Sequence, residues 1–305
     1  MPIVPIILIL FMIIMQPLNV HAFWGDDSPA LPAVTPADEG PLTSRAVHTD
    51  IPYIEESVNP HHMLDIYLPQ PIDNPEEAAL PVHIFVHGGG WNIGDKKSVD
   101  AREASAYTTD GIIVVSINYR LSPTHKHPAH IEDCAAAMRW VVDNIADYGG
   151  DGTNITLSGH SSGAHLVTLL GTHPRYLAEQ ELTRDRFKGI IAVDTASFDL
   201  TLEPEQRILK RWKRNAFGTS LTRLQEASPI AYINEDAQFS PLFIYTTAER
   251  PLAVEQSRRF AAGLLANGHN AVLSILDREL SHSDMKHLIF TRGTEIHTAI
   301  TSLSR

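Results

Sequence analysis

The five residues Gly159-His160-Ser161-Ser162-Gly163 form the pattern G-x-S-x-G. They lie between Ile155–Leu157, a run typical of a buried strand, and Ala164–Leu170, a run that predicts a helix. In that context the pattern is typical of a nucleophile elbow, a strained turn that exposes the central hydroxyl at the carboxyl edge of a sheet. The two glycines let neighbouring backbone approach closely. The sequence therefore predicts that Ser161 is a nucleophile; a glycine-serine turn without chemistry is the alternative.

A second glycine-rich segment, His87-Gly88-Gly89-Gly90-Trp91, follows a short strand predicted at Val82–Val86. Successive glycines let backbone N–H groups point inward and form an oxyanion hole, where they stabilise negative charge developing on a carbonyl oxygen. The expected donors are Gly89 and Gly90, or Gly90 and Trp91, joined by the N–H of Ser162. For the His87 imidazole we expect a structural role in bracing the loop.

Three segments together resemble the α/β-hydrolase superfamily: HGGGWNIGDK at 87–96, INYRLSP at 117–123 and YGGDGTNITLSGHSSGAHL at 148–166. Within it, the chain is similar to the carboxylesterase branch that includes hormone-sensitive-lipase-like esterases, feruloyl and acetylxylan esterases and arylformamidases. The similarity extends over roughly residues 45–300. It implies a catalytic triad in the chain order serine, Asp or Glu, then histidine.

The resemblance places the triad histidine after the last strand, which we predict at Ala271–Leu276. His282 is the candidate there, in preference to His287 and His297, which fall inside the last predicted helix, His297 as a surface residue. His282 would take the proton from Ser161 and later return it to the leaving alcohol.

The resemblance places the triad acid after the strand predicted at Pro241–Tyr245. Glu249 is the carboxylate at that position and is the expected acid, although many relatives have an aspartate there. Asp277, which is close to His282 in sequence, is the alternative. Asp199 arrives too early in the chain and is expected to be structural.

The elements that must position these residues alternate along the chain. Short apolar runs such as Ile112–Asn118 are separated by segments with helical periodicity, which is the pattern of a mostly parallel sheet with crossover helices. We therefore expect an α/β fold with a doubly wound, mostly parallel sheet of eight strands. Residues 203–228 are charged and aromatic and predict a small helical cap inserted over the sheet, and a final helix is expected around Met285–Ser302.

Composition narrows the class of protein. The 305 residues are 43% hydrophobic, which suits one large globular domain, and 24 Lys+Arg against 36 Asp+Glu give a net charge of −12. A general nucleic-acid binder is excluded because phosphate contacts need a basic face. The single cysteine, Cys134, excludes an internal disulfide and a cysteine-rich zinc site.

The N-terminal residues 1–22 resemble a secretory signal peptide, with an apolar core and the small residues Val20 and Ala22 before the expected cleavage site. An uncleaved membrane anchor is the alternative. Residues 23–44 predict a Pro-rich linker, and residues 45–305 the catalytic domain. We therefore expect a secreted or periplasmic protein.

The leading hypothesis is a serine carboxylesterase that hydrolyses small or aromatic esters through an acyl-enzyme on Ser161, without a cofactor. An arylformamidase-type amidase is the alternative, and a non-catalytic α/β-hydrolase that only binds its partner is a further one.

Two clusters of charged or metal-ligating residues are explained by structural roles without a ligand. We expect loop and capping roles rather than a metal site for His125, His127, His130 and Asp133. The solvated side of a cap helix is expected for the basic residues Arg207, Lys210, Arg211, Lys213 and Arg214, with contact to an anionic substrate or a membrane surface as the minor alternative.

Overall fold

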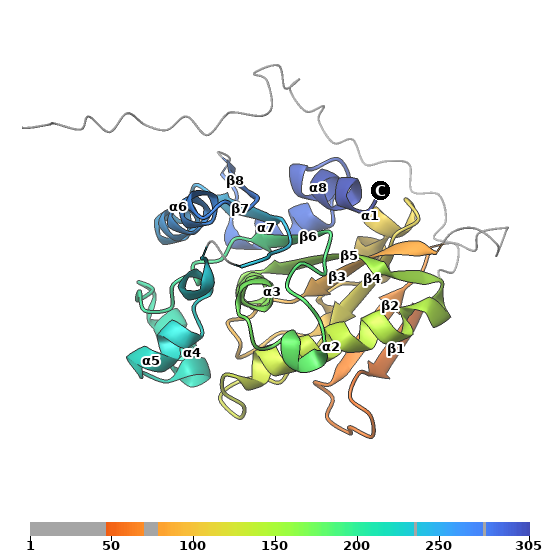
Figure 1. The fold of residues 1–305 in the computed structure, drawn as a ribbon, viewed down its shortest axis with the longest axis horizontal. Coiled ribbons are helices and arrows are strands. Elements are labelled where there is room, and N and C mark those ends of the chain that lie inside the picture. The colour runs from red at the N-terminus through yellow and green to blue at the C-terminus, as the bar shows by residue number, and fades with distance from the viewer. Residues whose placement is uncertain (1–46, 70–78, 235–236, 277–278) are drawn as a thin grey trace, which may run out of the picture. The chain divides into compact units, whose positions relative to one another are not determined.

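The computed structural model describes residues 47–69, 79–234, 237–276 and 279–305 (Figure 1). The predicted signal segment 1–22 and linker 23–44 lie outside these residues. None of the helices within the described ranges combines the length and hydropathy of a membrane-spanning segment.

The described residues contain one sheet of eight strands in the order β1-β2-β4-β3-β5-β6-β7-β8. The strands are β1 (Val47–Pro52), β2 (Met63–Tyr67), β3 (Leu80–Val86), β4 (Ile113–Ile117), β5 (Gly150–His160), β6 (Gly189–Val193), β7 (Leu242–Thr247) and β8 (Ala271–Leu276). Strand β2 runs antiparallel to β1 and β4, and the pairs from β4 to β8 are all parallel. The predicted doubly wound, mostly parallel eight-stranded sheet is confirmed, and it is not closed into a barrel.

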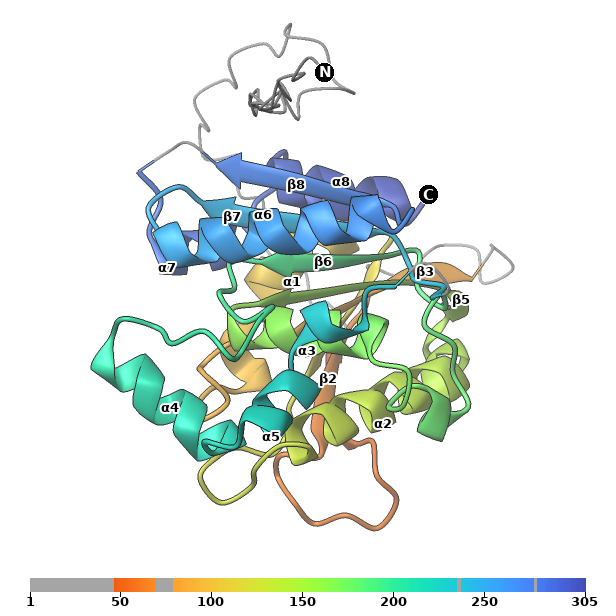
Figure 2. The same cartoon turned by 60° about the vertical axis from the view of Figure 1, so that its left-hand side comes forward.

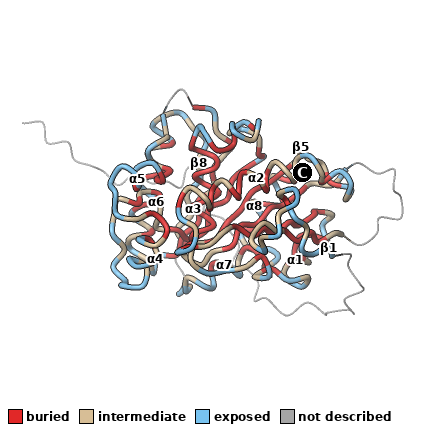
Figure 3. Tube along the Cα trace, turned by 90° about the horizontal axis from the view of Figure 1, so that it is seen from below, coloured by how far each residue is buried: buried red, intermediate tan, exposed pale blue. Residues whose placement is uncertain are grey.

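Helices cover both faces of the sheet, as Figures 1 and 2 show. The helices are α1 (Ala101–Thr108), α2 (Ala129–Asn144), α3 (Ser162–Thr172), α4 (Arg207–Phe217), α5 (Leu221–Glu226), α6 (Pro251–Ala266), α7 (His282–Ile289) and α8 (Glu295–Leu303). One hydrophobic cluster joins the sheet to α2, α3 and α6, and a second joins it to α1, α7 and α8. Every residue of α3 is buried, so the helix that follows Ser161 is held rigidly within the core (Figure 3).

The prediction of a single final helix is wrong, because two helices occupy that stretch. Helix α7 ends at Ile289, and Gly293 adopts a left-handed conformation (φ 79°) that interrupts the helical backbone. Thr294 then caps α8 by accepting a hydrogen bond from the His297 N–H at 3.1 Å.

Residues 203–228 contain α4 and α5, which lie between β6 and β7 in the chain (Figure 2). The basic residues on the exposed side of α4 are Arg207, Lys210, Arg211 and Arg214. Lys213 differs from the expectation of a solvated side chain. Its ammonium is buried and donates to the carbonyl oxygens of Leu200 and Leu202, both at 3.1 Å, and pairs with Glu203. Lys213 thus fastens α4 to the chain that follows β6.

Candidate active site

Ser161 occupies the sharp turn between β5 and α3. Its backbone has φ 57° and ψ −118°, a strained conformation for a residue with a side chain. The flanking glycines are required by close packing: a Cβ on Gly159 would lie 2.4 Å from the carbonyl carbon of Gly163, and a Cβ on Gly163 would lie 2.1 Å from the Val86 oxygen. The local sequence therefore folds into an elbow that presents the Ser161 hydroxyl at the carboxyl end of β5.

His282 is the first residue of α7. Ser281 caps this helix, because its hydroxyl accepts from the Asp284 N–H at 3.2 Å while the Asp284 carboxylate accepts from the Ser281 N–H at 2.8 Å. The capped turn places His282 Nε2 3.0 Å from Ser161 Oγ. The structure therefore brings together the two residues expected as nucleophile and base, which are 121 positions apart.

The other two histidines considered for this role lie elsewhere. His287 is exposed, and its nearest ionic partner is Glu103 at 3.9 Å. His297 is buried rather than on the surface, and its Nε2 lies 2.9 Å from the carbonyl oxygen of Ala106.

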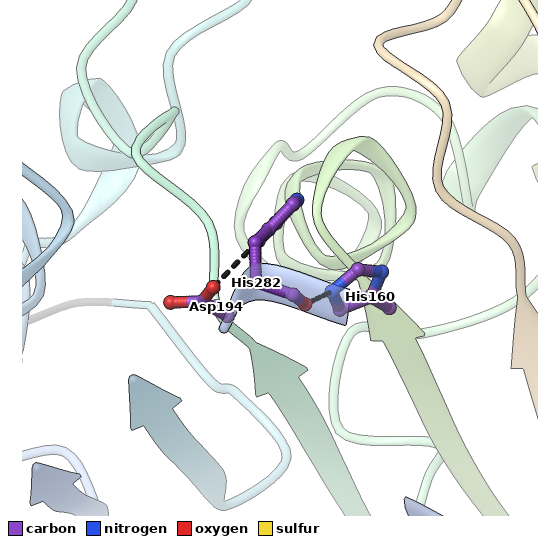
Figure 4. Close-up of side chains that lie close together, drawn as sticks. All are labelled: His160, Asp194 and His282. Carbon is purple, nitrogen blue, oxygen red and sulfur yellow. Dashed lines mark hydrogen bonds and ion pairs between the residues drawn. The ribbon is translucent and has the colours of Figure 1, made fainter. Parts of the chain in front are cut away.

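The carboxylate that contacts His282 is Asp194, directly after β6. Asp194 Oδ2 lies 2.5 Å from His282 Nδ1 (Figure 4). The other ring nitrogen of His282, Nε2, is the one that faces Ser161. Asp194 was not among the residues singled out from sequence. The available signal was its place at the end of the buried run Gly189–Val193, because parallel strands carry their carboxyl ends to the same edge of the sheet.

The structure does not bring Glu249 to His282. Glu249 is exposed on the turn after β7, where its backbone N–H lies 3.3 Å from the Thr247 hydroxyl. The neighbouring Arg250 turns inward instead and pairs with Asp194. The expectation that Glu249 faces His282 is thus corrected: the carboxylate that contacts His282 follows β6 and not β7, because β6 lies between β5 and β7 in the sheet and its end is nearer to the Ser161 strand.

Neither of the other two carboxylates considered as the acid is seen at His282. Asp277 lies outside the described residues. Asp199 accepts hydrogen bonds from the N–H and the hydroxyl of Thr201, at 3.0 and 2.5 Å, which is a structural turn contact.

The Asp194 carboxylate is fully enclosed and has a donor for each oxygen. Oδ1 accepts from the Thr246 hydroxyl at 2.9 Å, and Oδ2 accepts from His282 and from Arg250 Nη1, the latter at 2.8 Å. Burial by itself raises the pKa of Asp194, but the hydrogen bond from His282 and the charge of Arg250 outweigh burial and lower the pKa to about 2. Asp194 is therefore an anion at neutral pH.

The glycine-rich loop passes beside Ser161. A Cβ built on Gly88 would lie 3.2 Å from Ser161 Cβ, and Gly89 and Gly90 have φ values of 117° and 59° that favour glycine. In the part of the chain that the structure describes, the N–H groups of Gly89 and Gly90 donate no backbone hydrogen bond. The Ser162 N–H belongs to the first turn of α3, where N–H groups have no partner within the helix. The Ser162 N–H is thus adjacent to Ser161 in the chain, and the N–H groups of Gly89 and Gly90 belong to the loop that contacts Ser161 through Gly88.

The His87 side chain packs against this loop and stabilises it. Its ring is buried and stacks on Tyr119 with centroids 4.4 Å apart, and its Nδ1 lies 2.7 Å from the Gly88 oxygen. Burial lowers the pKa of His87 to about 4, so the ring is neutral near pH 7. These contacts match the structural role expected for His87.

A metal could in principle use atoms at this site. Among the described residues, His160, Asp194 and His282 form a group whose ligand atoms lie within 4.8 Å of one another. His282 Nδ1 already faces Asp194, and His160 Nε2 lies 2.8 Å from the His282 carbonyl oxygen (Figure 4). An ion bound to Nδ1 would displace the proton that orients His282. The donor set therefore fits a proton relay better than a metal site.

The other histidine cluster has partners of its own. Asp133 accepts hydrogen bonds from Arg120 Nη2 at 2.6 Å and from Arg120 Nε at 2.8 Å, and His130 Nε2 lies 2.9 Å from the Ser122 hydroxyl. The His127 N–H donates to the Ala216 oxygen of α4 at 2.8 Å. The first two contacts tie the loop before α2 to α2 itself, and the third ties it to α4.

Comparison with known proteins adds sequence relatives to this geometry. The BD-FAE family model matches residues 64–264. Esterase LipQ of Mycobacterium tuberculosis is 35% identical over 242 residues, which cover 74% of this chain and 54% of LipQ. Carboxylesterase NlhH of the same species is 41% identical over 91 residues, covering 30% of this chain and 28% of NlhH. The chain thus spans about half the length of LipQ and less of NlhH.

Two solved structures share the fold. A truncated form of a carbohydrate esterase from gut microbiota superposes with a TM-score of 0.68 at 21% identity, covering 85% of this chain and 96% of the other. Esterase B from Lactobacillus rhamnosis (HN001) gives a TM-score of 0.68 at 18% identity, covering 85% and 86%. The resemblance that we inferred from the motifs is confirmed, and the chain belongs to the BD-FAE family.

Proposed function

We propose that the protein is a serine carboxylesterase. The observation that carries this proposal is the continuous path from Ser161 Oγ to His282 Nε2, at 3.0 Å, and from His282 Nδ1 to Asp194 Oδ2, at 2.5 Å. This arrangement of hydroxyl, imidazole and carboxylate activates a serine for attack on an acyl carbon. The esterase relatives LipQ and NlhH support the same reaction class.

In the first half of the reaction, Ser161 Oγ attacks the ester carbonyl carbon while its proton passes to His282 Nε2. The carbonyl oxygen becomes an oxyanion, which the N–H groups of Gly89, Gly90 and Ser162 stabilise. The Asp194 carboxylate stabilises the imidazolium that forms. Collapse of the tetrahedral intermediate breaks the bond to the alcohol oxygen, which leaves with the proton from Nε2.

In the second half, water attacks the acyl carbon bound to Ser161 and gives a proton to His282 Nε2. The resulting intermediate breaks the bond to Ser161 Oγ, which recovers the proton, and the carboxylic acid is released. No cofactor takes part in these steps.

The proposed substrates are esters with a small or an aromatic acyl group. Support comes from α4, because the ring of Trp212 packs against Gly90: a Cβ on Gly90 would lie 2.3 Å from Trp212 Cε3. A bulky ring beside an expected oxyanion donor leaves little room for a long acyl chain.

Turnover of p-nitrophenyl esters with acyl chains of increasing length, beside feruloyl and N-formyl substrates, tests the proposal. We expect short esters to be hydrolysed and Ser161→Ala to abolish their hydrolysis. Equal hydrolysis by Ser161→Ala, or no hydrolysis of any ester, would contradict a serine esterase. Hydrolysis of the N-formyl substrate alone would favour the amidase alternative.

A further inference from the structure

Arg250 contacts both the backbone and the side chain of Asp194. Its Nη1 lies 2.7 Å from the backbone oxygen of Asp194 and 2.8 Å from the carboxylate Oδ2. The guanidinium is about a quarter exposed, whereas the Asp194 side chain is inaccessible to solvent. Arg250 therefore closes the solvent side of the carboxylate.

The hydrogens of this contact can be assigned. Arg250 Nη1 also lies 2.9 Å from His282 Nδ1. When Nδ1 carries the proton that it shares with Asp194, it has no lone pair for a second donor. The two hydrogens of Nη1 then go to the backbone oxygen and to Oδ2 of Asp194. Asp194 Oδ2 thus accepts hydrogen bonds from His282 Nδ1 and from Arg250 Nη1 at the same time.

Asp194 needs such a partner for two physical reasons. Its backbone has φ 54°, a left-handed conformation that is costly for a residue other than glycine, and the bond from Arg250 to its carbonyl oxygen helps to hold it. A fully buried carboxylate is also costly unless a charge balances it. Of the residues that the structure describes, Arg250 is the permanently charged cation paired with Asp194.

The position of Arg250 in the chain makes it a rigid support. It follows β7 and immediately precedes Pro251, the first residue of α6, so its backbone is constrained by the proline ring. The Oδ1 atom of Asp194 is meanwhile held by Thr246 within β7. Both carboxylate oxygens are therefore anchored to one segment, Thr246–Arg250, and rotation of the carboxylate would break contacts at both.

From this geometry we propose that Arg250 is a positioning residue for catalysis, which orients the Asp194 carboxylate toward His282 and keeps it ionised. The inference rests on the proposed esterase function. Arg250 touches no reacting atom, and it acts through Asp194. Misorientation of a catalytic group by even 1 Å lowers rates by about 100-fold, so the contact affects kcat rather than substrate binding.

The test measures kcat and KM of Arg250→Met with a short p-nitrophenyl ester. We expect kcat to fall by about 10- to 100-fold and KM to stay within about twofold. Arg250→Lys should retain more activity than Arg250→Met but less than the unmodified protein, because an ammonium cannot reproduce the forked guanidinium. Arg292→Met is the matched control, since Arg292 pairs with Asp110 at 2.8 Å outside the site, and its kcat should not change.

Two further measurements separate positioning from a general loss of structure. Guanidinium chloride at about 20 mM, far below denaturing concentrations, should restore part of the lost activity of Arg250→Ala and leave the activity of Arg292→Met unchanged. In an Asp194→Asn background, Arg250→Met should change kcat by less than about twofold, because its effect passes through Asp194. Circular dichroism shows which variants are folded. If Arg250→Met is not folded, the guanidinium rescue of Arg250→Ala and the activity of Arg250→Lys test the inference instead.

Unchanged kcat in folded Arg250→Met would overturn the inference, as would an equal fall of kcat in the presence and absence of the Asp194 carboxylate. Either result leaves the esterase proposal intact, provided that the unmodified protein hydrolyses the ester and Ser161→Ala does not. Absence of serine-dependent hydrolysis in the unmodified protein counts against the proposed function instead.

Discussion

The indole ring of Trp212 occupies the space that a side chain at Gly90 would need, with Trp212 Cε3 2.3 Å from the position of a Gly90 Cβ. A residue of α4 thus packs directly on the glycine-rich loop from 122 positions further along the chain. The contact makes the cap helix part of the wall around the expected oxyanion hole.

Replacing this ring should widen the range of acyl groups. We expect Trp212→Ala to raise kcat/KM for hexanoyl relative to acetyl p-nitrophenyl esters by about 10-fold, in line with the free energy of burying one or two methylenes. Trp140→Ala is the control, because Trp140 lies on α2 and packs near Tyr148 rather than on the glycine loop. The same chain-length profile in Trp212→Ala and in the unmodified protein would show that Trp212 does not limit the acyl site.

The identity of the acid is decided by parallel carboxylate variants. Asp194→Asn should lower kcat by about 1,000- to 10,000-fold, because the amide can no longer hold His282 in the required tautomer or stabilise its cation. Glu249→Gln should stay within about twofold of the unmodified protein, since Glu249 is exposed. Steady-state kinetics with one ester, with Asp277→Asn as a third arm, gives the answer. A near-normal Asp194→Asn beside an inactive Glu249→Gln would restore the acid expected from sequence.

Asn92 joins the glycine loop to α4 through three hydrogen bonds. Its Nδ2 donates to the oxygens of Gly90 and Trp212, at 2.6 and 3.0 Å, and its Oδ1 accepts from Asn215 Nδ2 at 2.8 Å. We expect Asn92→Ala to destabilise the protein by about 1–3 kcal/mol and to lower kcat, because half-buried backbone acceptors lose their donor and the loop loosens. Asn215→Ala removes one of these bonds and should have the smaller effect on both. Urea denaturation and ester kinetics of the two variants check this order.

Buried neutral histidines should make the fold sensitive to acid. Burial lowers the pKa of His127 and of His130 to about 3, well below the value of about 6.5 in an unfolded chain. The unfolded state therefore binds protons first, and the free energy of unfolding should fall as the pH drops below about 6.5, by about 1.4 kcal/mol per pH unit for each such histidine.

Urea midpoints between pH 7.5 and 5 test this dependence. His130→Gln should flatten the slope by the share of one histidine, even if it lowers stability at pH 7.5. Ile131→Val is the control, because it removes a buried methyl group without removing a titrating group, so its slope should match that of the unmodified protein. An unaltered slope in His130→Gln would mean that His130 does not contribute.

Asp194 also makes the free energy of unfolding fall with falling pH, but at lower pH. Its folded pKa of about 2 lies below the ordinary value of 3.8, so its stabilising effect is complete above about pH 4 and is lost as the pH falls toward 2. The difference corresponds to about 2 kcal/mol at neutral pH. The histidine effect extends from about pH 6.5 to about pH 3, so the two effects overlap only between about pH 4 and pH 3, and between pH 7.5 and 5 the slope reports the histidines alone.

Motifs made of contiguous residues were predictable because their chemistry is local. The turn at Ser161 depends on Gly159 and Gly163, two positions away on either side, and the glycine loop follows its strand directly. The doubly wound sheet was likewise predictable, because buried strands and amphipathic helices have distinct periodicities. The break at Gly293 was missed because one glycine alters a helical pattern very little.

The sequence by itself determined the sharp turn at Ser161, the glycine loop and the α/β architecture, since each is encoded by residues close together in the chain. Only the tertiary structure decided that Asp194 faces His282 across 88 positions, that Arg250 rather than Glu249 turns inward, and that Trp212 lies on Gly90. The side chains of two adjacent residues on a turn, such as Glu249 and Arg250, point in different directions because of the backbone geometry of the turn. Amino-acid composition does not reveal that geometry. Contacts between strand ends are set by the order of strands in the sheet, which places β6 beside β5.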